Sequence, residues 1–161
     1  MHHTGVTFYN NQIYTATSYD VYSNGAVIVY GQQGDTWRRV RIIYLPRSSS
    51  RTHRLSLGIA DDRMYVCNYT AYTVYIFLLD GYLLHEHKNR KCSHLCAVDS
   101  SGLLDACYGY ATLNALVNGE WRNNAVSGLD KYVRGAVLCD QLLYVASYYK
   151  SDGFLQLYSI E

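Results

Sequence analysis

Short apolar segments alternate with polar turns along the whole chain. One recurring segment alternates apolar positions with small or polar ones, and it occurs four times, at residues 12–16, 63–69, 102–108 and 142–148. Its equivalent residues Ile13, Met64, Leu103 and Leu143 are 51, 39 and 40 residues apart. Alternation with a period of two predicts strands, and the spacing predicts a structural repeat of near 40 residues with one insertion.

Further apolar segments flank each copy. Three copies follow a short apolar strand, at 57–60, 95–98 and 135–139, and each copy precedes another strand, at 26–30, 73–77, 112–116 or 154–158. Turn residues lead into a fourth strand in the first three copies, at 31–34, at Asp80-Gly81 and at Asn118-Gly119. The last copy stops after its third strand, and nothing in residues 1–5 predicts a strand that could complete it.

Four short antiparallel strands in each unit of about 40 residues are typical of a propeller blade. A helical repeat would need runs of about ten helix formers with a 3.6-residue apolar stripe, and we find none. The predicted fold is therefore all-β, a β-propeller-like arc of four blades with about four antiparallel strands each and a three-stranded last blade, in one domain covering residues 1–161. An open arc leaves apolar faces exposed, so we expect it to close as a small ring, pair with another chain or belong to a longer protein.

Residues 57–60, 64–68, 74–77 and the Asp80-Gly81 turn resemble one NHL-type repeat. The resemblance implies a propeller like the C-terminal one of TRIM-NHL-like proteins, which forms a closed ring of six blades. It also implies RNA as a partner, because some NHL-type domains bind RNA through a basic face. The family usually has an Asp after its second strand, where this chain has Asn68.

Tyrosine is unusually frequent, with 18 residues against 3 phenylalanines. A tyrosine occupies the end of the second strand in all four copies, as Tyr19, Tyr69, Tyr108 and Tyr148. Blade symmetry would place these phenols near one face of the disc, where flat rings with polar tips suit a protein, a peptide or stacked nucleobases. The alternative is that the four tyrosines fill the junctions between blades.

A cluster of six arginines joins the first and second copies, beside Trp37 and Tyr44. Its members are Arg38, Arg39, Arg41, Arg47, Arg51 and Arg54. Guanidinium groups near aromatic planes can hold phosphates and stack on bases, so Trp37, Arg38, Arg39 and Arg41 are binding candidates. The alternative is that Arg39 and Arg41, at alternate strand positions, line an exposed edge where charge prevents aggregation.

Charge and cysteine usage restrict the setting of the protein. The 161 residues carry a formal net charge of +1, so any basic surface is local. Five cysteines without paired spacing do not fit a secreted disulfide framework. We see neither a secretory signal nor an apolar segment long enough to cross a bilayer, so we expect a cytoplasmic protein with no membrane partner.

Catalytic motifs are missing from the sequence. It has no Gly-x-Ser-x-Gly, no His-Glu-x-x-His and no phosphate-binding glycine loop. Cys92, His94 and Cys96 are too few for a zinc site, and we expect no cofactor. The sequence favours a non-enzymatic recognition module that binds a protein or RNA partner and self-associates. The alternatives are a lactonase-like propeller hydrolase with a metal in its pore, and a purely structural scaffold.

Overall fold

The computed structural model describes residues 2–18, 25–47, 55–88, 94–99, 102–106, 113–117, 120–126, 132–139, 142–149 and 152–159. Within these ranges the chain forms fifteen strands and no helix. The strands form four sheets, and every sheet is antiparallel with its strands in chain order.

Each sheet is one blade of the predicted arc. Blade 1 contains β1 (His2–Tyr9), β2 (Gln12–Ser18), β3 (Gly25–Gln33) and β4 (Thr36–Tyr44). Blade 2 contains β5 (Leu55–Ala60), β6 (Arg63–Asn68), β7 (Thr73–Leu78) and β8 (Leu83–His87). Blade 3 contains β9 (His94–Asp99), β10 (Gly102–Ala106), β11 (Leu113–Val117) and β12 (Glu120–Val126). Blade 4 contains β13 (Tyr132–Cys139), β14 (Leu142–Tyr149) and β15 (Asp152–Ser159).

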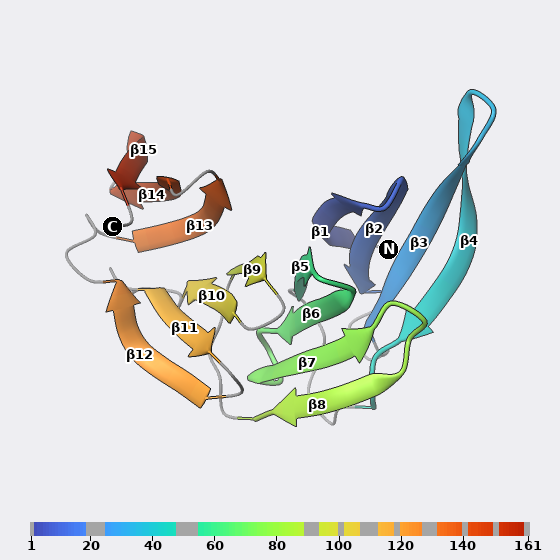
Figure 1. Ribbon diagram of the computed structural model, residues 1–161, viewed down its shortest axis with the longest axis horizontal. Helices are drawn as coiled ribbons and strands as arrows, with labels where there is room; N and C mark the ends of the chain where they lie inside the picture. The colour runs from blue at the N-terminus through green and yellow to red at the C-terminus, as the bar shows by residue number, and fades with distance from the viewer. Residues whose placement is uncertain are drawn as a thin grey trace.

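The four blades stand side by side along an arc (Figure 1). The first strand of each blade is innermost, and β1 contacts β5, β5 contacts β9, and β9 contacts β13. Figure 1 shows the arc open between blade 4 and blade 1. The all-β fold, the four blades and the three-stranded last blade are confirmed.

The first strand of blade 1 differs from the sequence-based expectation. Residues 1–5 predicted no strand, but β1 begins at His2, and His2 and His3 pair with Ser18 and Thr17 of β2. A bulge between His3 and Gly5 interrupts the register. Backbone pairing with β2 therefore determines the start of β1 at His2 and His3. The alternating apolar residues of β1 begin only after this segment.

Tight turns between the first and second strands explain how the inner hairpins form. Asn10 and Asn11 have φ angles of 47° and 54°, and Asp61 and Asp62 have φ angles of 44° and 60°. Two successive positive φ angles are characteristic of type I′ turns, whose twist matches that of paired strands and which asparagine and aspartate tolerate. The Tyr9 hydroxyl donates to Asp62 Oδ1 at 3.3 Å and accepts from the Asp62 backbone N–H at 3.2 Å, so the two turns lie side by side.

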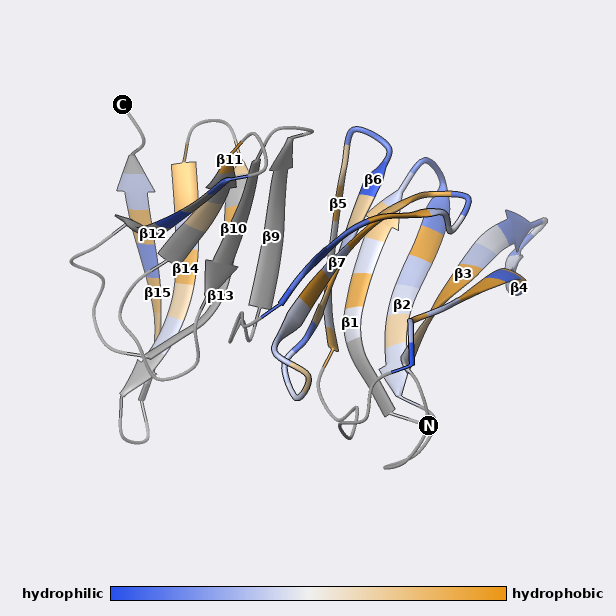
Figure 2. Ribbon diagram, turned by 90° about the horizontal axis from the view of Figure 1, so that it is seen from below, coloured by the Kyte–Doolittle hydropathy of each residue, from blue (hydrophilic) through white to orange (hydrophobic). Residues whose placement is uncertain are grey.

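The main core lies between blades 1 and 2. Successive residues of β3, β6 and β7 are buried on both faces of their sheets. One face of blade 1 packs against one face of blade 2. This core contains Tyr14, Ala16, Val27, Val29, Ile43 and Leu45 with Leu55, Leu57, Met64, Val66, Tyr75 and Phe77. Figure 2 shows the corresponding apolar bands on the strands of both blades. A blade therefore buries its faces only by packing on a neighbouring blade.

Candidate functional site

The hairpin of β3 and β4 runs beyond the rest of blade 1, as Figure 1 shows. The last pair between β2 and β3 joins Gln12 to Gly31, whereas β3 and β4 remain paired through Gln33 and Thr36. Gly34 begins the turn with a φ of 59°, a backbone region that glycine adopts without strain. We call residues 32–39, which form the end of this hairpin, the basic hairpin.

Aromatic and basic side chains are exposed together on the basic hairpin. Trp37 is partly exposed, and its ring meets the edge of the Phe8 ring of β1 with centroids 6.3 Å apart and planes at 81°. Arg38 and Arg39 follow it directly on β4, and both are exposed. The only acidic residue of the basic hairpin is Asp35 in its turn. Trp37 and Arg39 share one face of β4 and Arg38 points to the other, so the hairpin exposes an indole and two guanidinium donors.

Arg41 belongs to a different surface. A bulge shifts the register between β3 and β4, so that Arg39 pairs with Tyr30 and Arg41 pairs with Val29. Tyr30 and Val29 point to opposite faces of β3, and Arg39 and Arg41 therefore do so on β4. Both arginines are exposed on β4, the edge strand of blade 1, as the alternative expected, but the bulge turns them to opposite faces. Arg41 instead donates from Nη1 to the backbone carbonyl of Leu79 and links blade 1 to blade 2.

The remaining arginines of the predicted cluster are only partly described. Arg47 is exposed just after β4. Arg51 and Arg54 lie outside the described residues. The structure therefore places Trp37, Arg38 and Arg39 on the basic hairpin, with Trp37 and Arg39 on one face of β4 and Arg38 on the other. Arg41 is separate from them, because it binds blade 2.

The four predicted site tyrosines are described unequally. Tyr69 follows the last residue of β6 and its ring meets that of Tyr72 edge to face, with centroids 6.2 Å apart. Tyr148 lies in β14, but its side chain is outside the described part of the chain, as are Tyr19 and Tyr108 altogether. The ring of tyrosines therefore stays a prediction.

Tyr69 and the basic hairpin lie at opposite ends of the strands. The basic hairpin lies at the end that carries the β1–β2 and β5–β6 turns, since Gln12 pairs with Gly31. Tyr69 lies at the other end, where β6 turns into β7. A single partner surface therefore does not include both.

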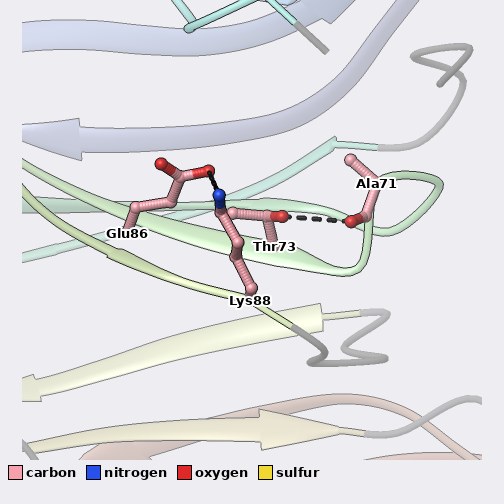
Figure 3. Close-up of polar contacts among 4 residues, drawn as sticks. All are labelled: Ala71, Thr73, Glu86 and Lys88. Carbon is pink, nitrogen blue, oxygen red and sulfur yellow. Dashed lines mark hydrogen bonds and ion pairs between the residues drawn. The ribbon is translucent and has the colours of Figure 1, made fainter. Parts of the chain in front are cut away.

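A buried asparagine closes the turn that carries Tyr69. Asn68 Oδ1 accepts a hydrogen bond from the Ala71 N–H at 3.1 Å, and the Asn68 side chain is buried. The Thr73 hydroxyl donates to the Ala71 carbonyl at 3.0 Å (Figure 3). The same view shows Lys88 and Glu86 at the end of β8, with Nζ 3.8 Å from Oε1. Asn68 thus supplies the acceptor that an aspartate would supply at this position.

We expect Asn68→Ala to lower the free energy of unfolding by about 1–2 kcal/mol, because it leaves the Ala71 N–H without its acceptor. Gln32→Ala is the control, since it removes an exposed amide and should change the free energy by less than about 0.5 kcal/mol. Urea unfolding of both variants measures the difference. Equal stability of the two would show that the Asn68 bond does not hold the turn.

Two further tyrosines are buried in the blades and have altered acidity. Burial raises the pKa of Tyr14, and the nearby Arg41 guanidinium partly opposes this. Burial also raises the pKa of Tyr75, and the negative charge of Glu86 adds to the effect. The neutral Tyr14 hydroxyl donates to Gln12 Oε1 at 2.9 Å. These tyrosines fill the blade junctions.

Potential metal ligands do not gather among the described residues. In those ranges no group of three or more His, Cys, Asp and Glu side chains is close enough to hold a metal ion. His85 and His87 share one face of β8, and their ring centroids are 5.8 Å apart. Cys92 is outside the described residues, and so are the side chains of His94 and Cys96. In the same ranges no helix has the length and apolarity that a membrane span requires.

Apolar side chains are exposed at both ends of the arc, and the sequence did not predict which ones. Val6 and Phe8 of β1 are exposed at one end, and Leu155 and Leu157 of β15 are exposed at the other. Their alternate spacing marks one apolar face of each strand. The spacing does not show whether a neighbouring blade covers that face. Only the number of blades, too few for the expected ring of six, indicated that some faces would be exposed.

Comparison with known proteins identifies the fold. No protein-family model matches the chain, and no curated protein matches its sequence. Among solved structures the chain is similar to Kuenenia stuttgartiensis hydrazine synthase, with a TM-score of 0.69, 13% identity, and coverage of 98% of this chain and 46% of that one. The fold is a β-propeller arc. With virginiamycin B lyase from Staphylococcus aureus the TM-score is 0.64 at 12% identity, covering 98% and 55% of the two chains.

A third similar structure is the WD40 β-propeller domain of Doa1, with a TM-score of 0.57, 13% identity, and coverage of 98% of this chain and 65% of that chain. The chain thus spans about half the length of the first two propellers and less than two thirds of the third. Propellers of this general shape include both binding domains and enzymes, and the similarity extends to the fold alone.

Proposed function

We propose that this propeller arc is a non-enzymatic recognition module whose basic hairpin binds a protein partner rich in acidic side chains. The observation that carries the proposal is the exposure of Trp37, Arg38 and Arg39 together on a hairpin that extends past β2. Tryptophan and arginine are the residues that most often dominate binding energy at protein interfaces. We also propose that the repeats are of the NHL type and that the protein is located in the cytoplasm.

The geometry favours an acidic protein over RNA. RNA binding through single strands uses several aromatic platforms along a basic groove, whereas the basic hairpin offers one exposed indole and two guanidinium groups. Arg41 does not extend this surface, because it is bound to Leu79. An indole and a guanidinium group on one face of the hairpin, with a second guanidinium group on the other face, suit a few carboxylates next to an apolar side chain.

Binding of a fluorescein-labelled peptide of alternating Glu and Leu residues, followed by anisotropy, tests the proposal. We expect Arg38→Ser with Arg39→Ser to weaken binding about tenfold or more, since two charge-assisted contacts are lost. Lys88→Ser with Arg122→Ser is the matched control, because it removes two exposed cations elsewhere, on blades 2 and 3. The control should leave binding within about twofold.

Two outcomes would contradict the proposal. Equal loss in the hairpin variant and the control would mean that net charge alone attracts the peptide. Tighter, arginine-dependent binding of a labelled single-stranded oligouridine than of the peptide would assign the basic hairpin to RNA.

A further inference from the structure

Both ends of the arc carry an apolar sheet face that no other blade covers within the described residues. We define the blade 1 free face by Val6, Phe8, Ile13, Tyr30 and Tyr44. We define the blade 4 free face by Val137, Tyr144, Ala146, Leu155 and Leu157. The exposed fractions are 70% for Val6, 62% for Phe8, 74% for Leu155 and 58% for Leu157. Exposed apolar faces of this kind mark interaction sites.

The blade 4 free face is the counterpart of a face that is buried in blade 1. In blade 1, Tyr14 pairs with Val29 and Ala16 pairs with Val27, and blade 2 covers all four residues. In blade 4, Tyr144 pairs with Leu157 and Ala146 pairs with Leu155 in the same register. The tetrapeptides 13–16 and 143–146 read Ile-Tyr-Thr-Ala and Leu-Tyr-Val-Ala. Blade 4 therefore offers the surface on which a further blade packs.

The blade 1 free face is the counterpart of the covering surface. Leu57 of blade 2 pairs with Val66, is 6% exposed and packs against blade 1. Val6 of blade 1 pairs with Thr15 in the equivalent register. Ile13 likewise corresponds to Met64, which is fully buried in the junction. The two free faces are thus the two halves of one blade junction, located at opposite ends of the same chain.

We propose that two copies of this chain associate head to tail, so that blade 1 of each copy packs on blade 4 of the other. Each contact then reproduces the packing of blade 2 on blade 1. Propellers contain roughly four to eight blades, so two four-bladed arcs complete a ring and three exceed it. The part of hydrazine synthase and of virginiamycin B lyase that this chain leaves uncovered is about as large as the part it covers. This association goes beyond the proposed function. Trp37, which contacts Phe8, and Arg39, which pairs with Tyr30, lie on the same side of blade 1 as its free face, whereas Arg38 points to the other side.

Such contacts are heterologous, since two different surfaces meet. This property makes the proposal separable from an ordinary two-fold dimer in which blade 1 meets blade 1. A charge placed on either free face should break both junctions of the ring. In a dimer of one blade 1 variant with one blade 4 variant, one junction contains no substitution. The other junction contains both introduced charges, which attract each other when their signs are opposite.

The test measures the mass of the chain by analytical ultracentrifugation with Phe8→Lys, Leu157→Glu and their equimolar mixture. We expect the wild-type chain at twice 18.4 kDa, and each variant to dissociate at least about 100-fold more readily, because a charge in an apolar junction is unpaired. We expect the mixture to restore the dimer. Tyr82→Glu, at an exposed position outside both faces, should dimerise like the wild type. Far-UV circular dichroism confirms that each variant folds.

Three results would overturn the proposal. The first is a wild-type chain that remains at 18.4 kDa at about 100 µM. The second is a dimer that Phe8→Lys breaks and Leu157→Glu does not, which would indicate symmetric pairing of blade 1. The third is a mixture that stays monomeric although each variant is folded. Phe8→Glu provides a further control. Alone it should dissociate the dimer, and mixed with Leu157→Glu it should restore less dimer than Phe8→Lys does, because two negative charges then meet in the junction.

Discussion

Replacing Phe77 with alanine should lower the free energy of unfolding by about 3–5 kcal/mol. Phe77 lies in β7 with 2% of its surface exposed, and its ring packs in the core between blades 1 and 2. Its ring centroid is 6.2 Å from that of Tyr75. The substitution removes buried apolar surface and leaves a cavity that four paired strands on either side cannot fill.

Phe154→Ala provides the matched control for this prediction. Phe154 lies in β15 with 47% of its surface exposed, so its removal should cost no more than about 1.5 kcal/mol. Chemical unfolding of both variants, followed by circular dichroism, measures the two losses. If the loss at Phe77 is no larger than the loss at Phe154, the junction between blades 1 and 2 is not the main core.

The strand pattern of this chain was predictable because the same sequence of short strands recurs in each blade. Leu143 and Val145 of β14 alternate with partly or fully exposed neighbours, whereas β6 is buried from Met64 to Asn68 because its sheet is covered on both faces. That alternation follows from the period of two of a strand, so it is written directly into the sequence. The repeat distance then gave the number of blades before any contact was known.

Features set by contact between distant residues were not predictable in this way. The bulge that turns Arg39 and Arg41 to opposite faces adds one residue to β4 relative to β3. An added residue leaves no mark on the alternation of a polar segment such as residues 36–41. The strand character of His2 and His3 likewise comes from pairing with β2 and not from their side chains.

The residues of the candidate site were predictable from the sequence, but their position in the fold was not. Trp37, Arg38 and Arg39 were selected because basic and aromatic residues cluster there. Their position on the basic hairpin depends on β3 and β4 being longer than β2. The separation of Tyr69 from the basic hairpin depends on strand direction, which links residues far apart in the chain.

A substitution at Gly5 should show how closely the inner strands must approach. A Cβ atom built on Gly5 would lie 3.2 Å from the Leu57 backbone nitrogen and 3.3 Å from the Ser56 Cα. Both contacts are with the backbone of β5, so no side-chain rotation relieves them. We expect Gly5→Val to lower the free energy of unfolding by about 2–3 kcal/mol, because the added methyl groups force β1 and β5 apart.

Gly153→Val separates this steric effect from the loss of a glycine. Gly153 lies in β15 and a Cβ atom there would meet nothing within 4 Å, so valine should change the free energy of unfolding by less than about 0.5 kcal/mol. Gly5→Ala should fall between the two valine variants. Urea unfolding distinguishes the three, and equal stability of Gly5→Val and Gly153→Val would mean that β1 can move away from β5 without loss. Because the first strands of all four blades line the inside of the arc, the β1–β5 distance limits how tightly the arc can curve.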